Sequence, residues 1–235
     1  MRLLATMRWP EVEPDVVLVP VGSLEQHGPA LGLATDALVA AHVTRRAATE
    51  LDQGDQSFVV APTVPYGASG EHEDFPGTIS IGHEALHLML LELGRSASRW
   101  APGVVFVNGH GGNVASLVSA VTQLREEGRG VAWTSCRASD LDAHAGRSET
   151  SLMLALAPDT VARDRLVPGC TDPVASLMPR LRSEGVRAVS PTGVLGDPTT
   201  ATAAAGRRIL AEMVDRLVVE LTALDVGSQG RLTWT

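Results

Sequence analysis

The sequence predicts an α/β fold in which a mostly parallel central sheet carries helices on both faces. Short, nearly continuous apolar runs are bounded by glycine, proline or polar residues, which is typical of strands buried on both faces. Segments with apolar residues at helical spacing lie between these runs and after the last of them. Strands that alternate with helices favour a parallel sheet covered by two helical layers.

Four apolar runs are the expected strands. In chain order they are VVLVPV (16–21), FVVAPTV (58–64), VVFVNG (104–109) and GVAWTSC (130–136). Hydrophobic residues make up 44% of the chain and aromatic residues only 3%. Alanine, valine and leucine must therefore fill the core between the strands and the helices.

Helices are expected between and after these strands, at residues 36–51, 83–99, 113–127 and 203–224. Asp36 and Asn113 begin two of these segments and belong to the residue types that frequently cap helix N-termini. A further helix is expected to follow the segment DAHAGRSETS. Since no flexible linker or internal repeat is apparent, we expect one domain spanning residues 1–235.

Composition excludes several classes of protein. The net charge is −8 and no basic run is longer than two arginines, which argues against nucleic-acid binding. No apolar run approaches the ~20 residues of a membrane span, and the N-terminal MRLLATMRWPEVEPD lacks the apolar core of a signal peptide. Cys136 and Cys170 fit neither a disulfide framework nor a metal spacing. We therefore expect a cytoplasmic protein.

The segment HEALH (83–87) matches the H-E-x-x-H pattern of zinc peptidases. On a helix, His83 and His87 share a face and Glu84 would be the general base. However, this helix lies between two predicted strands, and crossover helices cover the faces of a sheet rather than its ends. A zinc peptidase also needs a third ligand and an open metal position. We therefore interpret His83 and His87 as helix residues, with the zinc peptidase as the alternative.

The other histidines show a more informative placement. His27, His72, His110 and His144 each lie in the segment that follows one of the four strands. Ligands of open α/β sheets bind beyond the carboxyl ends of the strands, where the connecting loops meet. A single histidine of this kind is more often structural, but four together favour a metal site or an acid–base site.

The segment SLEQHGPALGLATD is the sharpest part of this pattern. Glu25 and His27 are two residues apart, so in an extended chain both side chains point the same way. Asp36 follows across a loop, and it could equally be a plain helix N-cap. Glutamate, histidine and aspartate are a suitable ligand set for Zn²⁺, Mn²⁺ or Fe²⁺. In NGHGGN, glycines flank His110 and permit close approach of the backbone to a ligand; a simple tight turn is the alternative.

Five blocks, in this order, resemble the creatininase (creatinine amidohydrolase) family. They are VPVGSLEQHGPALGLATD, PYGASGEHEDFPGTIS, VNGHGGN, DAHAGRSETS and GVLGDPTTAT, which together span roughly residues 16 to 205. The resemblance implies a three-layer α/β sandwich and a hydrolytic centre with two divalent ions, Fe²⁺ or Zn²⁺ or both, with Mn²⁺ also suited. It further implies a homo-oligomer, often a hexamer.

The resemblance also implies roles for individual residues. It makes Glu25, His27, Asp36 and His110 metal ligands, with Asp36 bridging the two ions. Creatininase itself has a glutamate ligand where this chain has Gly112, and we expect Glu149 to replace it as the fifth ligand and to act in catalysis. His144 is expected to protonate the leaving nitrogen. The residues expected to orient the substrate are Ser69, His72, Thr78, Gly111 and Gly112.

Within the family, the blocks DAHAGRSETSLMLALAPD and AVSPTGVLGDPTTATAAAG most resemble the mycofactocin-system branch. This resemblance implies a peptidase that releases a C-terminal Val-Tyr dipeptide from a modified ribosomal precursor peptide. One alternative is a small-molecule amidohydrolase acting on a creatinine-like, formamide or N-formyl substrate. The other is a non-catalytic metal-binding assembly protein.

Overall fold

The computed structural model describes residues 1–52 and 54–234. Five strands are present in this part of the chain: β1 (Arg2–Leu3), β2 (Val16–Val21), β3 (Phe58–Val60), β4 (Gly103–Asn108) and β5 (Val131–Ser135). Within the described residues they form one parallel sheet with the strand order β1-β3-β2-β4-β5. Strands β2 and β4 pair in parallel along their whole lengths, from Val16 opposite Gly103 to Val21 opposite Asn108.

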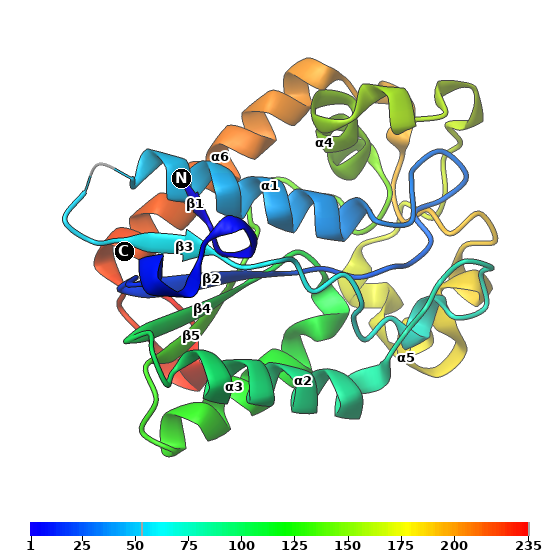
Figure 1. Cartoon of the computed structure of the whole chain (residues 1–235). Helices are drawn as coiled ribbons and strands as arrows, with labels where there is room; N and C mark the ends of the chain where they lie inside the picture. Colours follow the sequence, from blue (N-terminus) through cyan, green and yellow to red (C-terminus); the bar gives the residue numbers. More distant parts are fainter. Residues whose placement is uncertain (53, 235) are drawn as a thin grey trace.

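Two helical layers cover the sheet, and the predicted α/β class is thereby confirmed (Figure 1). Helices α2 (Gly82–Ala97) and α3 (Val114–Glu126) lie on one face, and α1 (Thr35–Glu50) and α6 (Ala203–Ala223) lie on the other. Consecutive residues of a strand point to opposite faces, so β2 contributes to both cores. Val17 belongs to the core beneath α2 and α3, whereas Leu18 belongs to the core beneath α1 and α6.

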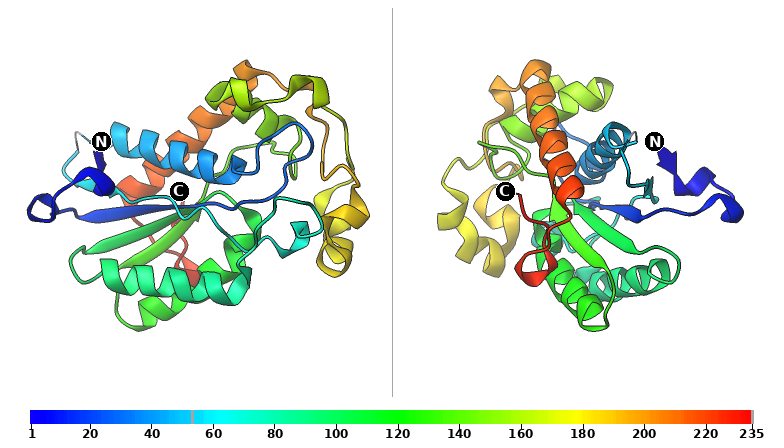
Figure 2. Two further views of the ribbon diagram at one scale, coloured as in Figure 1. Left: turned by 45° about the vertical axis from the view of Figure 1, so that its right-hand side comes forward. Right: turned by 90° about the vertical axis from the view of Figure 1, so that its left-hand side faces the viewer.

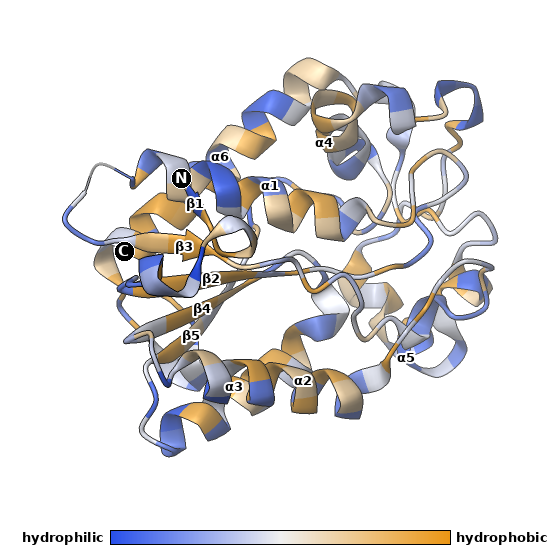
Figure 3. Ribbon diagram, in the orientation of Figure 1, coloured by the Kyte–Doolittle hydropathy of each residue, from blue (hydrophilic) through white to orange (hydrophobic). Residues whose placement is uncertain are grey.

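The strands are apolar along their lengths because both faces are buried, as Figure 3 shows for the centre of the molecule. Every residue of β2 is buried, which is why its sequence reads VVLVPV rather than alternating with polar residues. No helix in the described part of the chain is both long and apolar enough to cross a lipid bilayer.

Two further helices lie towards the carboxyl ends of the strands (Figures 1 and 2). Helix α4 (Arg147–Leu156) packs against α6. Helix α5 (Val174–Val189) lies beyond the end of the sheet and contacts the short 3₁₀-helix η3 (Gly70–His72). The expected helix after DAHAGRSETS is thus present as α4, although it begins inside that segment. These two helices flank the end of the sheet where the loops meet.

Several predicted boundaries differ from the structure. The strand expected at 58–64 ends at Val60, because Pro62 lacks an N–H to donate; Val64 alone resumes pairing, with Val21. The two-residue strand β1 and helix α5 were not predicted. Helix α5 contains Pro179 and is interrupted at Gly185, where φ is 76°, so its pattern reads as a loop.

The two expected N-caps are also corrected. Helix α1 begins at Thr35 after Ala34, so Asp36 lies inside the first turn and does not cap it. Asn113 precedes α3, but its side chain makes no capping hydrogen bond. Instead, its amide donates to the carbonyl of Gly22 and its oxygen accepts from the backbone N–H of Ala68. Asn113 therefore ties three strand-end loops together.

Gly206 sets the distance between α6 and α4. A Cβ atom at this position would overlap the backbone carbonyl oxygen of Ser151 in α4. Since Glu149 lies two residues before Ser151, this contact also fixes the N-terminal turn of α4 relative to the rest of the sheet.

We predict that Gly206→Ala destabilises the protein. A glycine-to-alanine change inside a helix normally gains up to about 1 kcal/mol, but the backbone overlap should outweigh this and give a net loss of about 1–3 kcal/mol. Urea denaturation would measure the loss. The control is Gly32→Ala, where an added methyl meets nothing within 4 Å. Equal stability of the two variants would contradict the proposed helix contact.

Candidate metal centre

The carboxyl ends of the strands bring four buried histidines together. His27 follows β2, His72 follows β3, His110 follows β4 and His144 follows β5. The ring centroids of His27 and His144 are 4.4 Å apart, those of His72 and His144 are 4.5 Å apart, and those of His72 and His110 are 6.3 Å apart. The convergence expected from their positions in the sequence is therefore what the structure shows.

Glu25 lies at the centre of this cluster. Its side chain is fully buried, and within the described residues neither carboxylate oxygen has a hydrogen-bond partner. Oε2 lies 3.2 Å from Nε2 of His110, and Oε1 lies 3.4 Å from Nε2 of His72. A buried carboxylate without a partner is strongly destabilising unless positive charge compensates it. The arrangement around Glu25 therefore fits a bound cation.

Asp36 connects two histidines from different loops. Its Oδ1 lies 3.2 Å from Nε2 of His27, and its Oδ2 lies 3.2 Å from Nδ1 of His110. The hydroxyl of Ser23 donates to Oδ2 at 2.6 Å and fixes the orientation of the carboxylate. Each carboxylate oxygen therefore faces a different histidine, and Asp36 joins the loop of His27 to the loop of His110.

His27 is oriented by its own loop. Its Nδ1 lies 3.0 Å from the carbonyl oxygen of Glu25, to which it donates, so Nε2 faces Asp36. Glu149 approaches from α4, with Oε2 3.8 Å from Nε2 of His27. The backbone N–H of Ala145 donates to the same Oε2 at 2.5 Å. Asp36 and Glu149 thus face the free nitrogen of His27.

Three sets of side chains in the described residues bring candidate ligand atoms within 4.8 Å of one another. They are Glu25, His27 and Asp36; His27, His144 and Glu149; and Glu25, His72 and His144. The sets share members, so they form one extended centre rather than separate sites. This centre has the carboxylate and imidazole donors that Zn²⁺, Fe²⁺ or Mn²⁺ accept.

The electrostatics divide the histidines into two kinds. Burial alone would lower the pKa of His27, but Asp36 and Glu149 outweigh burial and raise the pKa to about 10. The pKa of His110 likewise rises to about 10, because Glu25 and Asp36 overcome the effect of burial. The carboxylates around these two rings therefore stabilise positive charge. A divalent cation would compete with protons for the nitrogens of His27 and His110.

The other two histidines stay neutral. Burial, together with His110 and His27, lowers the pKa of His72 to about 3. Burial and the nearby His27 also hold the pKa of His144 well below its usual value. Burial raises the pKa of the Glu25 and Glu149 carboxyl groups to about 7. The centre therefore holds neutral imidazoles beside carboxyl groups that ionise near neutral pH.

Gln26 orients both neutral histidines. Its side-chain amide donates to Nδ1 of His72 at 2.8 Å. Its backbone carbonyl accepts from Nε2 of His144 at 2.8 Å, which leaves Nδ1 of His144 facing Glu25. Sequence reasoning missed Gln26. Alternation along an extended chain would direct it away from Glu25 and His27, but in this irregular loop its side chain turns to the same histidine that Glu25 faces.

The residues expected to orient a substrate fall into two groups. His72, Gly111 and Gly112 line a cleft of about 1050 Å³ that opens onto the centre. Ser69 is fully buried, with Oγ 3.4 Å from Nε2 of His110. The hydroxyl of Thr78 accepts from the backbone N–H of Gln26 at 3.0 Å. Neither Ser69 nor Thr78 is in the cleft wall; each instead supports a residue of the centre.

Gly112 has no room for a side chain. A Cβ atom there would overlap the Ala68 carbonyl oxygen and Nε2 of His110. Oε1 of Glu71 lies 3.0 Å from that Cβ position and 3.8 Å from Nε2 of His110. Glu149, which was expected to replace a carboxylate at position 112 as the fifth ligand, lies beside His27 and belongs to one of the candidate metal sets. The carboxylate nearest the expected location is that of Glu71, which sequence reasoning did not single out.

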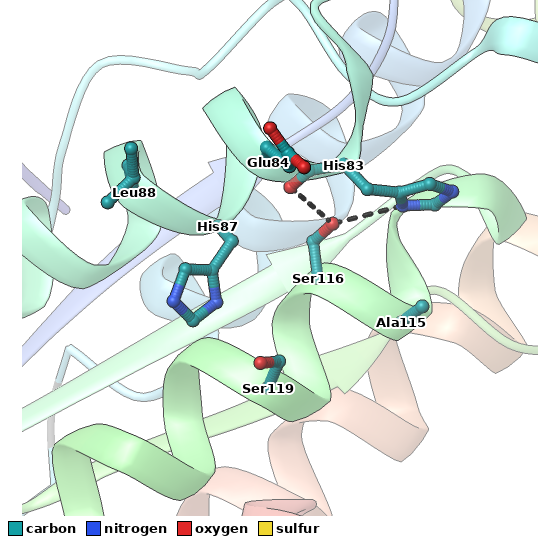
Figure 4. A pocket seen from close by; sticks show the side chains of 7 residues that line it. All are labelled: His83, Glu84, His87, Leu88, Ala115, Ser116 and Ser119. Atoms are coloured by element: carbon teal, nitrogen blue, oxygen red, sulfur yellow. Dashed lines mark hydrogen bonds between the residues drawn. The ribbon is translucent and has the colours of Figure 1, made fainter.

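The HEALH segment lies in the first turns of α2, and its histidines face α3 (Figure 4); His83 also lines the cleft above the centre. Nδ1 of His83 lies 3.1 Å from the hydroxyl of Ser116, and the ring of His87 is directed towards Ser119. The candidate metal sets of the described residues include neither histidine. The placement agrees with our interpretation of His83 and His87 as helix residues.

Comparison with known proteins supports the family that the five sequence blocks resemble. The family model described as creatinine amidohydrolase matches residues 5–221. Proteins named mycofactocin precursor peptide peptidase are similar: that of Mycolicibacterium smegmatis is 57% identical, covering 93% of this chain and 89% of the relative, and that of Mycobacterium ulcerans is 54% identical, covering 96% and 90%.

A solved structure described as "Creatininase Mn" superposes with a TM-score of 0.75 at 28% identity, covering 92% of this chain and 95% of that chain. It agrees with the layered sheet, and the matched residues 5–221 include all five sequence blocks. The family expected from those blocks is thus confirmed: the chain belongs to the creatininase family.

Proposed function

We propose that this protein is a metal-dependent peptidase that releases a C-terminal Val-Tyr dipeptide from the modified precursor peptide of mycofactocin biosynthesis. The observation that carries the chemistry is the buried carboxylate of Glu25, which lies among four histidines and accepts no hydrogen bond from the described residues. The peptide substrate is supported by relatives at 57% and 54% identity that are named for it. A small-molecule amidohydrolase and a non-catalytic assembly protein are less well supported, because these relatives are named as peptidases.

The residues divide naturally between two ion positions. Glu25 and His110 would hold one ion, His27 and Glu149 would hold the other, and Asp36 would contact both. When bound, such ions supply Lewis acidity, which polarises an amide carbonyl and makes water more acidic. Zn²⁺, Fe²⁺ and Mn²⁺ each suit these donors, and the similar structure described as "Creatininase Mn" supports Mn²⁺ among them.

His144 would move the proton. Its Nε2 donates to the backbone of Gln26, so Nδ1 carries the lone pair and faces the centre. Its lowered pKa keeps this nitrogen free at neutral pH. Nδ1 would accept a proton from the attacking water and then deliver it to the leaving nitrogen of the cleaved amide.

Four expectations from the sequence stay predictions. They are the single domain over residues 1–235, the cytoplasmic location, the homo-oligomeric assembly of hexamer type, and the presence of two ions rather than one.

Removal of metal should abolish peptide cleavage. Protein stripped with a chelator should release no dipeptide from the modified precursor peptide, and adding back Fe²⁺, Zn²⁺ or Mn²⁺ singly should identify the ion that restores release. Mass spectrometry of the peptide measures both. Full activity of a sample shown by elemental analysis to be metal-free would refute the proposal.

Substitution of the ligands should remove metal and activity together. Glu25→Gln and His27→Ala should lower both the bound metal and kcat/KM, the latter by more than about 100-fold, because each removes a donor that the buried centre needs. The matched control is the double variant His83→Ala/His87→Ala, which should keep its metal. If the control loses metal and the first two variants do not, the HEALH segment is the metal site.

His144→Asn should separate catalysis from metal binding. Loss of a general acid–base group lowers kcat by about 10²- to 10⁴-fold, with little change in KM or metal content. Elemental analysis and steady-state kinetics on the same preparation would test this. A variant that has lost an ion would show that His144 is a ligand instead.

A further inference from the structure

Helix α5 forms one wall of the cleft above the centre. The cleft has a volume of about 1050 Å³, and α5 contributes Met178, Leu181, Arg182 and Val186 to its lining. The helix comes close to the centre at Gly185, where a Cβ atom would be 3.2 Å from the carbonyl oxygen of Glu71. Since Glu71 precedes His72, the wall lies next to a residue of the centre itself.

The three arginines of α5 differ in their contacts. Arg180 donates to the carbonyl of Ala188 at 3.0 Å and pairs with Glu184 at 3.4 Å. Arg187 donates to the carbonyl of Asp74 at 2.8 Å and lies over the ring of Phe75. Arg182, in contrast, is exposed and makes no hydrogen bond or ion pair within residues 1–52 and 54–234. Of the three, it is the one that lines the cleft.

The charges of the cleft make Arg182 unusual. Among the described residues, it is the only lysine or arginine in the lining, whereas the acidic side chains there are Asp36, Glu71, Glu73, Asp74, Glu149 and Glu184. A negatively charged group on a ligand would be repelled by most of this wall. Away from the metal ligands, the guanidinium of Arg182 is the feature that could bind such a group, and its planar fork matches a carboxylate.

A substrate cut two residues from its end carries a carboxylate close to the scissile bond. Two extended residues span roughly 7 Å, so that carboxylate must lie near the centre. Arg182 lies three residues before Gly185, where α5 passes close to the loop of His72. The exposed Val174 and the half-buried Met178, which line the same cleft, offer apolar surface to an apolar or aromatic C-terminal residue.

We propose that Arg182 binds the free C-terminal carboxylate of the peptide substrate and thereby determines that cleavage occurs two residues from the end. This proposal rests on the peptidase function proposed above. It assigns a substrate class to the cleft: peptides with an unblocked C-terminus and apolar terminal side chains.

The test compares two forms of the same precursor peptide, one with a free C-terminal carboxylate and one with a C-terminal amide. The metal-loaded full-length protein should cleave the carboxylate form with a kcat/KM about 10- to 100-fold higher, as expected from a lost charge-assisted hydrogen bond. In Arg182→Gln this ratio should fall towards one, mainly through a higher KM for the carboxylate form. Arg182→Lys, which keeps the charge without the fork, should give an intermediate ratio.

Arg180→Ala is the matched control, because it removes an arginine from the same helix outside the cleft lining, and it should keep the wild-type ratio. Metal content and thermal unfolding of each variant identify any that misfold. If Arg182→Gln and Arg182→Lys fold, bind metal and keep the wild-type ratio, Arg182 is not the carboxylate site although the peptidase function stands. If the wild-type protein cleaves neither peptide, the peptidase function fails, and the proposal for Arg182 fails with it.

Discussion

A negative charge buried at the end of a parallel sheet governs the whole centre. Glu25 is fully buried just beyond β2, and its carboxylate has no hydrogen-bond donor in the described part of the chain. Such a group is tolerated only where cations or protonated neighbours can be recruited. The surrounding histidines meet this need: Glu25 is the main cause of the raised pKa of His110, and Asp36 is the main cause of the raised pKa of His27.

The sheet makes this arrangement possible because its register is fixed far from the centre. β2 and β4 pair along their full lengths and are buried on both faces, so their carboxyl ends cannot shift relative to each other. Asn108 then holds His110 by accepting from its backbone N–H, and Asn113 ties the loops after β2, β3 and β4 together. Apolar packing thus supplies the rigidity, and amide side chains transmit it to the polar end of the fold.

The parts of the structure that depend on local patterns could be predicted from sequence. Buried strands gave continuous apolar runs, and four histidines beyond those runs located the centre. The parts that failed depend on where a side chain points within an irregular loop. Of the two readings of Asp36, the N-cap is excluded because the side chain turns into the centre, and the approach of Glu71 to His110 was not foreseen. Helix α5 was missed because Pro179 and the break at Gly185 obscure its periodicity.

The crowding at Gly112 ties this position to a loop more than forty residues earlier in the chain. Any side chain here would overlap the Ala68 carbonyl and the ring of His110, while the Glu71 carboxylate occupies the adjacent space. A Gly112→Glu substitution therefore cannot be accommodated unless the loop that bears Ala68 and Glu71 moves as well. Because α5 contacts that loop at Gly185, such a movement would reach the wall of the cleft, so a single added side chain at the centre would change the shape of the space above it.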